Sequence, residues 1–413
     1  MGEVYGYELV ARALQNEGAD TMFFIMGGPM LGAQDSCRRL CMKVIDVRHE
    51  QAAAMMANAY ARVTGKAGVC STASGPAATN LLTGLAHALT DAAPIVALGG
   101  ASPIHHFHSE AFQEVDQLSM MRPASKWAGQ AVSPKRLPEY INIAYRHAMN
   151  GRMGPSYLDL PGDVLYSQVD EDEVTWPAPA QTRHRSMGDA GQVAEAVNML
   201  SRAERPLIVS GTGVIWADAA EELQQFVDAT GIPFFTTPQG RGVVPEDHPR
   251  CFLSARSMAF READAILFLA TRFNYVISHG QAPRFGAGAK SIQVNIDPTE
   301  IGRNRPVDVG IVGDAKAVLR QMLDLVDGKF EPTKETAWVA ALREQDLKGQ
   351  ARIEPLMHSD EVPIHPLRLC KEVKDFLDRD AILVVDGQEI LNYGRQSIPT
   401  FRPGHRLNSG SFG

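Results

Sequence analysis

The sequence predicts an α/β protein built from doubly wound parallel sheets. Short, continuously apolar runs alternate with helix-like segments along most of the 413 residues. Such runs are typical of parallel strands that helices cover on both faces. Each run ends in glycine or proline, so a row of loops is expected along one edge of each sheet. The length allows two or three domains.

The composition excludes several classes of protein. A net charge of −8 provides no basic surface for nucleic acid, and no apolar run is long enough to cross a bilayer. The five cysteines are scattered without Cys-x-x-Cys spacing, as expected of reduced thiols. We therefore expect a cytoplasmic enzyme with neither a nucleic-acid nor a membrane partner.

Residues 1–167 form the first predicted domain. It contains a short buried strand at 42–45 and helices at 52–62 and 77–88, and its other strands are expected at 21–25, 68–73, 94–98 and 157–160. Residues 168–189 follow as a linker, because much of this segment is acidic, contains proline and lacks periodicity.

The second predicted domain covers residues 190–328, with strands at 206–209, 232–236, 265–270 and 291–296. A charged, partly helical linker is expected at 329–362, and a third domain at 363–413 begins with a helix at 366–377 and a strand at 381–386. A sheet of one or two strands cannot bury its faces. We therefore expect the third domain to be incomplete and the sequence to be part of a longer protein.

Glu50 is predicted to lie between the strand at 42–45 and the helix at 52–62, at the kind of turn where open α/β sheets bind ligands. Two interpretations are open for this residue alone. It is either a helix-start glutamate favoured by the helix dipole, or a poorly solvated carboxyl group beside Met55 and Met56 that shares a proton with a cofactor ring.

Four motifs occur in a characteristic order: Arg48-His49-Glu50-Gln51, Ser74-Gly75-Pro76-Ala77-Ala78-Thr79-Asn80, Ala111-Phe112-Gln113-Glu114 and Asn295-Ile296-Asp297-Pro298-Thr299-Glu300-Ile301. Together they resemble the thiamine diphosphate enzymes of the acetolactate synthase superfamily. The stretches 272–280 and 394–413 look like the branch that contains 2-hydroxyacyl-CoA lyases and oxalyl-CoA decarboxylases. Within it, the loop 111–114 is closer to the lyases, because the decarboxylases are expected to carry Tyr-Glu there.

The resemblance implies thiamine diphosphate with Mg²⁺ as the cofactor. Glu50 would hydrogen-bond the aminopyrimidine ring, and Gln113 would donate to an alkoxide that develops on the substrate. The other implied cofactor contacts are Gly27, Gly28, Pro29, Pro76, Asn80, Gly387, Gln388, Glu389 and Ser411. The glycine-containing turns and Asn80 are also explained by ordinary strand-to-helix turns and by a surface asparagine.

Two features depart from the family pattern. Glu389 stands where the nearest relatives show a neutral residue, and a carboxylate beside phosphate is unfavourable unless it is protonated or turned away. The Gly-Asp-Gly segment with a distal Asn-Asn, which holds magnesium in the family, is absent. No metal ligand is therefore expected in this chain, and that segment would have to follow Gly413.

The resemblance further implies a nucleotide in the central domain. ADP is favoured over FAD because Arg272-Phe273-Asn274-Tyr275 replaces the Arg-Phe-Asp-Asp of FAD-binding relatives, and over NAD because the turn at 211–214 lacks the full dinucleotide fingerprint. A vestigial fold without nucleotide is the alternative. The candidate contacts are Arg152, Gly211, Gly213, Gly240, Arg241, Arg272, Asp297 and Asp314.

The activity implied is cleavage of the C1–C2 bond of a 2-hydroxyacyl-CoA, such as 2-hydroxyisobutyryl-CoA, to formyl-CoA and a ketone or aldehyde. Oxalyl-CoA decarboxylase and an acetolactate synthase-like carboligase are the alternatives within the superfamily. A nucleotide-binding protein without catalysis is the alternative outside it. The resemblance also implies an acyl-CoA partner and a homodimer or homotetramer with active sites between subunits.

Overall fold

The computed structural model describes residues 2–180 and 184–412, apart from the side chain of Gln388. It divides into two compact units, mainly Met1–His184 and Arg185–Ser411. Both units are α/β, and their main sheets are entirely parallel. The predicted fold class is thus confirmed. The predicted domain boundaries stay predictions, and residues 181–183 of the first linker lie outside the described residues.

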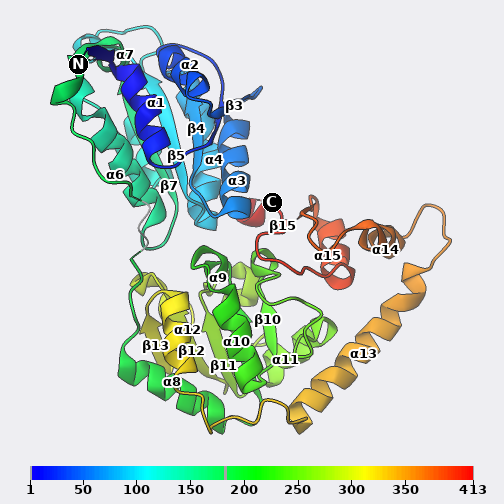
Figure 1. Ribbon diagram of the computed structural model, residues 1–413. Helices are drawn as coiled ribbons and strands as arrows, with labels where there is room; N and C mark the ends of the chain where they lie inside the picture. The colour runs from blue at the N-terminus through cyan, green and yellow to red at the C-terminus, as the bar shows by residue number, and fades with distance from the viewer. Residues whose placement is uncertain (1, 181–183, 413) are drawn as a thin grey trace. The chain divides into compact units, whose positions relative to one another are not determined.

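The first unit contains a six-stranded sheet in the order β3-β2-β4-β5-β7-β6. Helices α1 and α6 pack together on one face, and α3 and α4 pack together on the other (Figure 1). Its elements are β1 (Glu3–Tyr5), α1 (Gly6–Asn16), β2 (Thr21–Phe24), α2 (Leu31–Arg39), β3 (Lys43–Asp46), α3 (Glu50–Thr64), β4 (Gly68–Thr72), α4 (Pro76–Asp91), β5 (Ile95–Ala101), α5 (Gln117–Met121), β6 (Trp127–Gln130), α6 (Leu137–Met149), β7 (Pro155–Pro161), α7 (Gly162–Tyr166) and β8 (Gln168–Asp170).

The second unit contains a five-stranded sheet in the order β10-β9-β11-β12-β13. One core includes side chains of α8, α10 and α12, and a second, rich in phenylalanine, includes side chains of α11 and α13. Its elements are α8 (Ala190–Arg202), β9 (Pro206–Ser210), α9 (Gly213–Trp216), α10 (Ala220–Thr230), β10 (Phe234–Thr236), α11 (Arg256–Glu262), β11 (Ala265–Leu269), β12 (Lys290–Asn295), β13 (Val309–Val312), α12 (Ala315–Leu323), α13 (Ala337–Met357), α14 (Pro366–Phe376), β14 (Leu383–Val384), α15 (Gln388–Ser397) and β15 (Arg406–Leu407).

The strand before Glu50 differs from its prediction. The strand β3 lies at the edge of the sheet and pairs only with β2, so its side chains are exposed or half-buried rather than buried. The apolar pattern Val44-Ile45 identified a strand but could not show that it would have a neighbour on one side only. The sequence also gave no sign of the edge strands β6 and β13.

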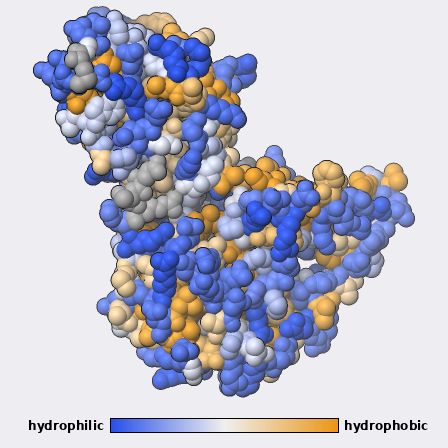
Figure 2. All heavy atoms as spheres, viewed as in Figure 1, coloured by the Kyte–Doolittle hydropathy of each residue, from blue (hydrophilic) through white to orange (hydrophobic). Residues whose placement is uncertain are grey.

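The C-terminal segment forms only a small sheet. Strands β14 and β15 pair over two residues each, and nearby apolar side chains stay exposed, among them Val384 and Phe376. Figure 2 shows apolar side chains among hydrophilic ones on the surface at the right of the view, in the region of α14 and α15 in Figure 1. The expectation that so few strands bury little apolar surface holds here.

Candidate active site

The candidate site of the first unit lies where its sheet changes direction. From β2 the chain moves outward to β3, and it then returns to place β4 on the opposite side of β2. The loops after β2 and β4 therefore flank a topological switch point, where open α/β sheets bind their ligands. These loops touch, since the Ser74 amide donates to the Gly28 carbonyl at 3.4 Å.

Glu50 is the first residue of α3 and faces a partner on α4. Its Oε2 accepts a hydrogen bond from Asn80 Nδ2 at 2.9 Å. The contact is possible because the two helices pack closely: a Cβ at Gly84 would lie 2.5 Å from the Ala54 Cβ. The N-cap is His49, whose Nδ1 accepts from the Gln51 amide at 3.1 Å.

The expected burial of Glu50 is only partly observed. The residue is half-buried and Asn80 is exposed, while the neighbouring Met56 is 38% exposed. The physical reason is the position of α3, whose first turn follows the edge strand β3 and faces solvent. Within this chain alone, the carboxylate is therefore accessible to water.

Gln113 is held in a loop against the turn that follows β4. Its φ is +58°, and its Oε1 accepts from the Ser74 hydroxyl at 3.1 Å. Gly75, at φ +59°, makes the approach possible, because a Cβ there would lie 2.2 Å from the Gln113 carbonyl oxygen. Glu114 closes the same loop by accepting from the amides of His108 and Ala111, and these two hydrogen bonds lower the pKa of its carboxyl group.

The remaining N-terminal candidates line the same edge. A Cβ at Gly27 would lie 2.6 Å from that of Ala73, whereas one at Gly28 would meet nothing within 4 Å. Pro29 packs against Gly100, where an added Cβ would lie 2.4 Å from the proline Cδ. Pro76, the first residue of α4, is exposed.

The second unit repeats this arrangement at its own switch point, between β9 and β11. A Cβ at Gly211 would lie 2.4 Å from the Ala270 carbonyl oxygen, and one at Gly213 would lie 2.8 Å from the Ala270 Cβ. Gly240 packs on Gly211 in turn, with 3.0 Å between its added Cβ and the Gly211 carbonyl carbon. Arg272 lies two residues after Ala270 in the sequence, so four predicted nucleotide contacts gather at this edge.

Two predicted carboxylates at this edge have local partners. Asp297 Oδ1 accepts from both the amide and the hydroxyl of Thr299, at 2.9 and 2.7 Å. Asp314 caps α12 by accepting from two backbone amides, and its Oδ1 also pairs with Arg185 Nη1 at 2.8 Å. Both side chains therefore stabilise turns of this unit.

Arg241 lies in a different environment from the one predicted. It is buried in a bidentate ion pair with Glu246, and it donates to the carbonyls of Arg395 and Ile398 at 3.2 and 3.1 Å. Its donors are thus used within the protein, and we exclude it from the nucleotide site. Arg152 belongs to the first unit, where it donates to the Leu89 carbonyl at 3.2 Å.

Comparison with known proteins identifies the family. Residues 5–120 match the model of the thiamine pyrophosphate enzyme N-terminal TPP binding domain, and residues 193–322 match that of the central domain. The chain belongs to the thiamine pyrophosphate enzymes. This confirms the resemblance and the thiamine diphosphate prediction.

Relatives of this thiamine pyrophosphate enzyme carry three different names. It is 31% identical over 412 residues to 2-hydroxyacyl-CoA lyase 1 of Mus musculus, covering 100% of this chain and 71% of the relative. It is 35% identical to a probable acetolactate synthase large subunit of Methanocaldococcus jannaschii (99% and 71% covered). It is 30% identical to the oxalyl-CoA decarboxylase of Escherichia coli K12 (99% and 73% covered).

The residues at the first switch point fit the ring end of this family's cofactor. Glu50 offers a carboxylate oriented by an amide, and the open space over Gly28 allows a flat ring to approach the backbone. The loops that carry Gly27 and Gln113 also carry exposed apolar side chains, Met26 at 68% and Phe112 at 86% exposure. A heteroaromatic ring with nitrogen atoms matches this mixture of apolar surface and a single carboxylate.

The C-terminal candidates lie at the start of α15 and in a short turn near the end of the chain. Gly387, at φ +89°, is the N-cap of α15, and its amide donates to the Asp386 carboxylate at 2.8 Å. Glu389 is exposed in the first turn of that helix, and Ser411 is half-buried in a short 3₁₀ turn. The side chain of Gln388 is outside the described ones.

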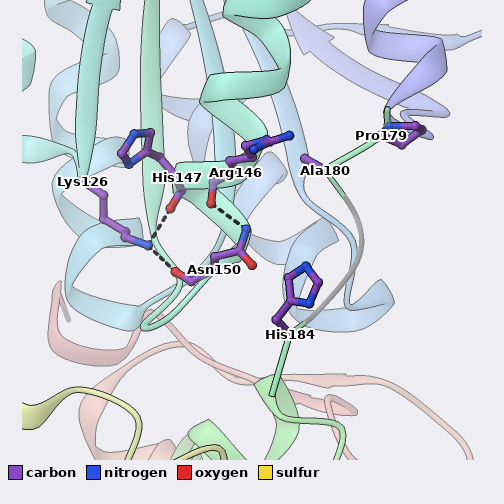
Figure 3. Close-up of a pocket in the computed structure, with 7 residues that line it drawn as sticks. All are labelled: Lys126, Arg146, His147, Asn150, Pro179, Ala180 and His184. Carbon is purple, nitrogen blue, oxygen red and sulfur yellow. Dashed lines mark hydrogen bonds between the residues drawn. The ribbon is translucent and has the colours of Figure 1, made fainter. Parts of the chain in front are cut away.

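A cavity of about 410 Å³ in the first unit lies away from these residues (Figure 3). Lys126 precedes β6 and Asn150 precedes β7, so the cavity borders the amino ends of the strands, opposite the candidate site. The ammonium group of Lys126 donates to the carbonyls of His147 and Asn150 at 2.5 and 2.8 Å. Lys126 thereby neutralises the carboxyl end of α6. Sequence reasoning singled out none of the lining residues.

No helix in residues 2–180 and 184–412 is long and apolar enough to cross a membrane.

Proposed function

We propose that this enzyme cleaves the C1–C2 bond of a 2-hydroxyacyl-CoA, with 2-hydroxyisobutyryl-CoA as the first substrate to try. The products are formyl-CoA and a ketone or aldehyde. The reaction balances because the C1–C2 bond breaks, the substrate hydroxyl loses a proton as it becomes the carbonyl, and C1 gains a proton. Thiamine diphosphate supplies the carbanion chemistry when bound. The chain's own residues orient the reactants.

The observation that carries the proposal is the pairing of Gln113 with Ser74. Gln113 Oε1 accepts a hydrogen bond from the Ser74 hydroxyl. The amide oxygen is therefore turned toward Ser74, and the Nε2 group is left to donate to the substrate. That group donates to a developing alkoxide without changing its own protonation state. The decarboxylases are expected to carry Tyr-Glu in this loop, so Gln113-Glu114 here has an amide where they have a phenol.

Glu50 is proposed to hydrogen-bond the pyrimidine ring of the cofactor. Asn80 occupies Oε2, so that the other carboxylate oxygen is directed to the ring. The half-exposed state of Glu50 favours a second copy of the chain as its cover, because this role requires exclusion of competing water. Exposed apolar side chains near this edge suit such an interface: Met26, Leu31, Met56, Phe112, Val115 and Met120.

Two further ligands belong to the proposal. ADP would bind at the switch point between β9 and β11, where Gly211, Gly213 and Gly240 allow the loops to pack closely and Arg272 supplies positive charge for phosphate. Mg²⁺ would bind with the diphosphate. Among the described residues, no cluster of histidine, cysteine or carboxylate side chains is arranged to hold a metal ion.

The deciding experiment compares the protein with Glu50→Gln and a control variant, Glu139→Gln, whose carboxylate pairs with Arg136 on the surface of α6. Thiamine diphosphate binding is measured by titration calorimetry with Mg²⁺ present, and turnover is measured as formyl-CoA release. We expect Glu50→Gln to lose about 10²–10⁴-fold in turnover with most of the cofactor affinity retained. The control variant should match the unmodified protein.

Full turnover by Glu50→Gln would refute the assigned role. The same assay with oxalyl-CoA separates the lyase from the decarboxylase, because the decarboxylase releases carbon dioxide and the lyase leaves oxalyl-CoA intact. Carbon dioxide release would therefore replace the lyase assignment by the alternative.

A further inference from the structure

Gln117 is the first residue of the short helix α5, and its side-chain amide makes several buried hydrogen bonds. It is 4% exposed. Its Oε1 accepts from the Gly75 amide at 2.9 Å, and its Nε2 lies 2.7 Å from the Gly100 carbonyl oxygen and 2.6 Å from Asp159 Oδ1. One amide therefore joins the ends of β4, β5 and β7, which are neighbours in the sheet.

The orientation of this amide is fixed by its partners. Gly100 and Asp159 present only acceptors, so the nitrogen must face them and the oxygen must face the Gly75 amide. Tyr157 supports the arrangement, because its hydroxyl donates to the same Asp159 oxygen at 2.7 Å. Gly99 provides the room, since a Cβ there would lie 2.0 Å from the Tyr157 hydroxyl.

The turn that Gln117 holds is also the support of Gln113. Gly75 backs onto the Gln113 carbonyl, and Ser74 in the same turn donates to Gln113 Oε1 at 3.1 Å. The packing of Gly75 on the Gln113 backbone and the hydrogen bond of Ser74 to the Gln113 side chain thus both depend on a turn whose amide is bonded by Gln117. Loss of that bond leaves a buried amide without its partner and frees the turn to move.

We propose that Gln117 is a positioning residue, whose amide locks the Ser74–Gly75 turn and thereby directs the Gln113 amide toward the substrate. This rests on the proposed role of Gln113 in the reaction. Displacing a reacting group by about 1 Å lowers rates by about 10²-fold. The predicted defect is therefore in kcat, with the cofactor contact of Glu50 on α3 preserved.

Gln117→Glu tests the proposal through pH. The substitution keeps the shape, but it places a second carboxyl group against Asp159 and the Gly100 carbonyl oxygen. When both carboxyl groups are ionised they repel, which moves the new side chain away and leaves the Gly75 amide without its acceptor. A proton shared by the pair restores the contact, and the pair holds this proton more tightly than either group alone. The other titratable groups facing the cluster are fixed near neutral pH. Burial raises the pKa of Cys70 to about 12 and that of Tyr157 well above 10, and hydrogen bonds with Ser119 lower the pKa of Asp116.

We expect Gln117→Glu to lower kcat by about 10–100-fold at pH 8, with the Kd for thiamine diphosphate and Mg²⁺ changed less than about threefold. Activity should partly return at pH 6, where the pair shares a proton. It should also return at pH 8 in Gln117→Glu/Asp159→Asn, because the asparagine donates to the new carboxylate. Unchanged kcat in Gln117→Glu, or a loss that neither lower pH nor Asp159→Asn relieves, overturns the proposal.

Hydrogen exchange separates this proposal from the proposed function. Amide exchange of the segment 104–116 should increase in Gln117→Glu and decrease again in the double variant, whether or not Gln113 acts in the reaction. Gln113→Ala is assayed beside them. If it keeps full kcat while exchange follows the expected pattern, the role of Gln113 fails and the structural lock by Gln117 stands. Unchanged exchange in Gln117→Glu overturns the lock itself.

Discussion

The two main sheets of this enzyme have similar strand orders, but they differ in whether the predicted ligand-binding side chains are already engaged by partners within the protein. Each has a switch point, between β2 and β4 in the first unit and between β9 and β11 in the second. At the first, Glu50 and Gln113 have partners that orient them and leave part of each functional group accessible. In the second unit, Asp314 after β13 and Arg241 after β10 are engaged by a helix cap and a buried ion pair.

This difference teaches that a position at a strand end is not sufficient evidence of ligand binding. Strand ends gather glycines, carboxylates and arginines for two reasons: ligands need them, and so do helix caps and tight turns. The hydrogen-bond partners decide which reason applies. The comparison yields four predictions, in order of decreasing effect on stability.

Arg241→Met should cause the largest loss of stability. It leaves Glu246 buried without its partner, and breaking a buried ion pair costs about 3–5 kcal/mol. The free energy of unfolding is measured by denaturant titration. The double variant Arg241→Met/Glu246→Leu should recover most of the loss, because no charge is then left unpaired. A variant of normal stability that has lost ADP affinity would make Arg241 a ligand contact and would contradict the comparison.

Gly75→Ala should be the most damaging single change at the first switch point. The residue has φ +59°, and the added Cβ would lie 2.2 Å from the Gln113 carbonyl oxygen. Strain of this kind costs about 2 kcal/mol or more, and turnover should fall with it. Gly28→Ala is the matched control for stability alone, because its Cβ meets nothing within 4 Å in the protein. Equal thermal midpoints for the two variants would show that the turn at 74–76 is not constrained as described.

Asp314 separates a structural carboxylate from a ligand contact. Asp314→Ala removes the cap of α12 and the partner of Arg185, which should cost about 1 kcal/mol. Asp314→Asn retains a capping oxygen and should cost less. We expect ADP affinity, measured by calorimetry, to be the same in Asp314→Asn as in the unmodified protein. A tenfold loss of affinity in that variant would instead place the carboxylate on the nucleotide.

The smallest effect is expected at acidic pH, at Asp20 in the first unit. Hydrogen bonds from Lys66 and Tyr60 lower the pKa of Asp20 from 3.8 to about 2. Since the folded state holds this proton more weakly than the unfolded state, the stabilisation is fully present above pH 4 and is lost as pH falls through about 2. Thermal unfolding of Asp20→Asn should depend less on pH in that range. Identical pH profiles would contradict the assignment.

The sequence by itself determined most of the buried strands of the two main sheets and where their loops fall. Apolar runs such as 68–73 and 265–270 coincide closely with β4 and β11, because burial on both faces leaves a continuous pattern. It also placed Glu50, Gly75 and Gly211 at strand ends, and the family motifs added the cofactor.

Only the tertiary structure decided what those side chains can do. Sequence could not show that β3 has a neighbour on one side only, which leaves Glu50 half-exposed. It could not show that Arg241 meets the carbonyls of residues 395 and 398, or that Gln117 joins three strands. These outcomes depend on partners far away along the chain. A hydrogen bond requires both groups to meet, so one local pattern specifies only half of it.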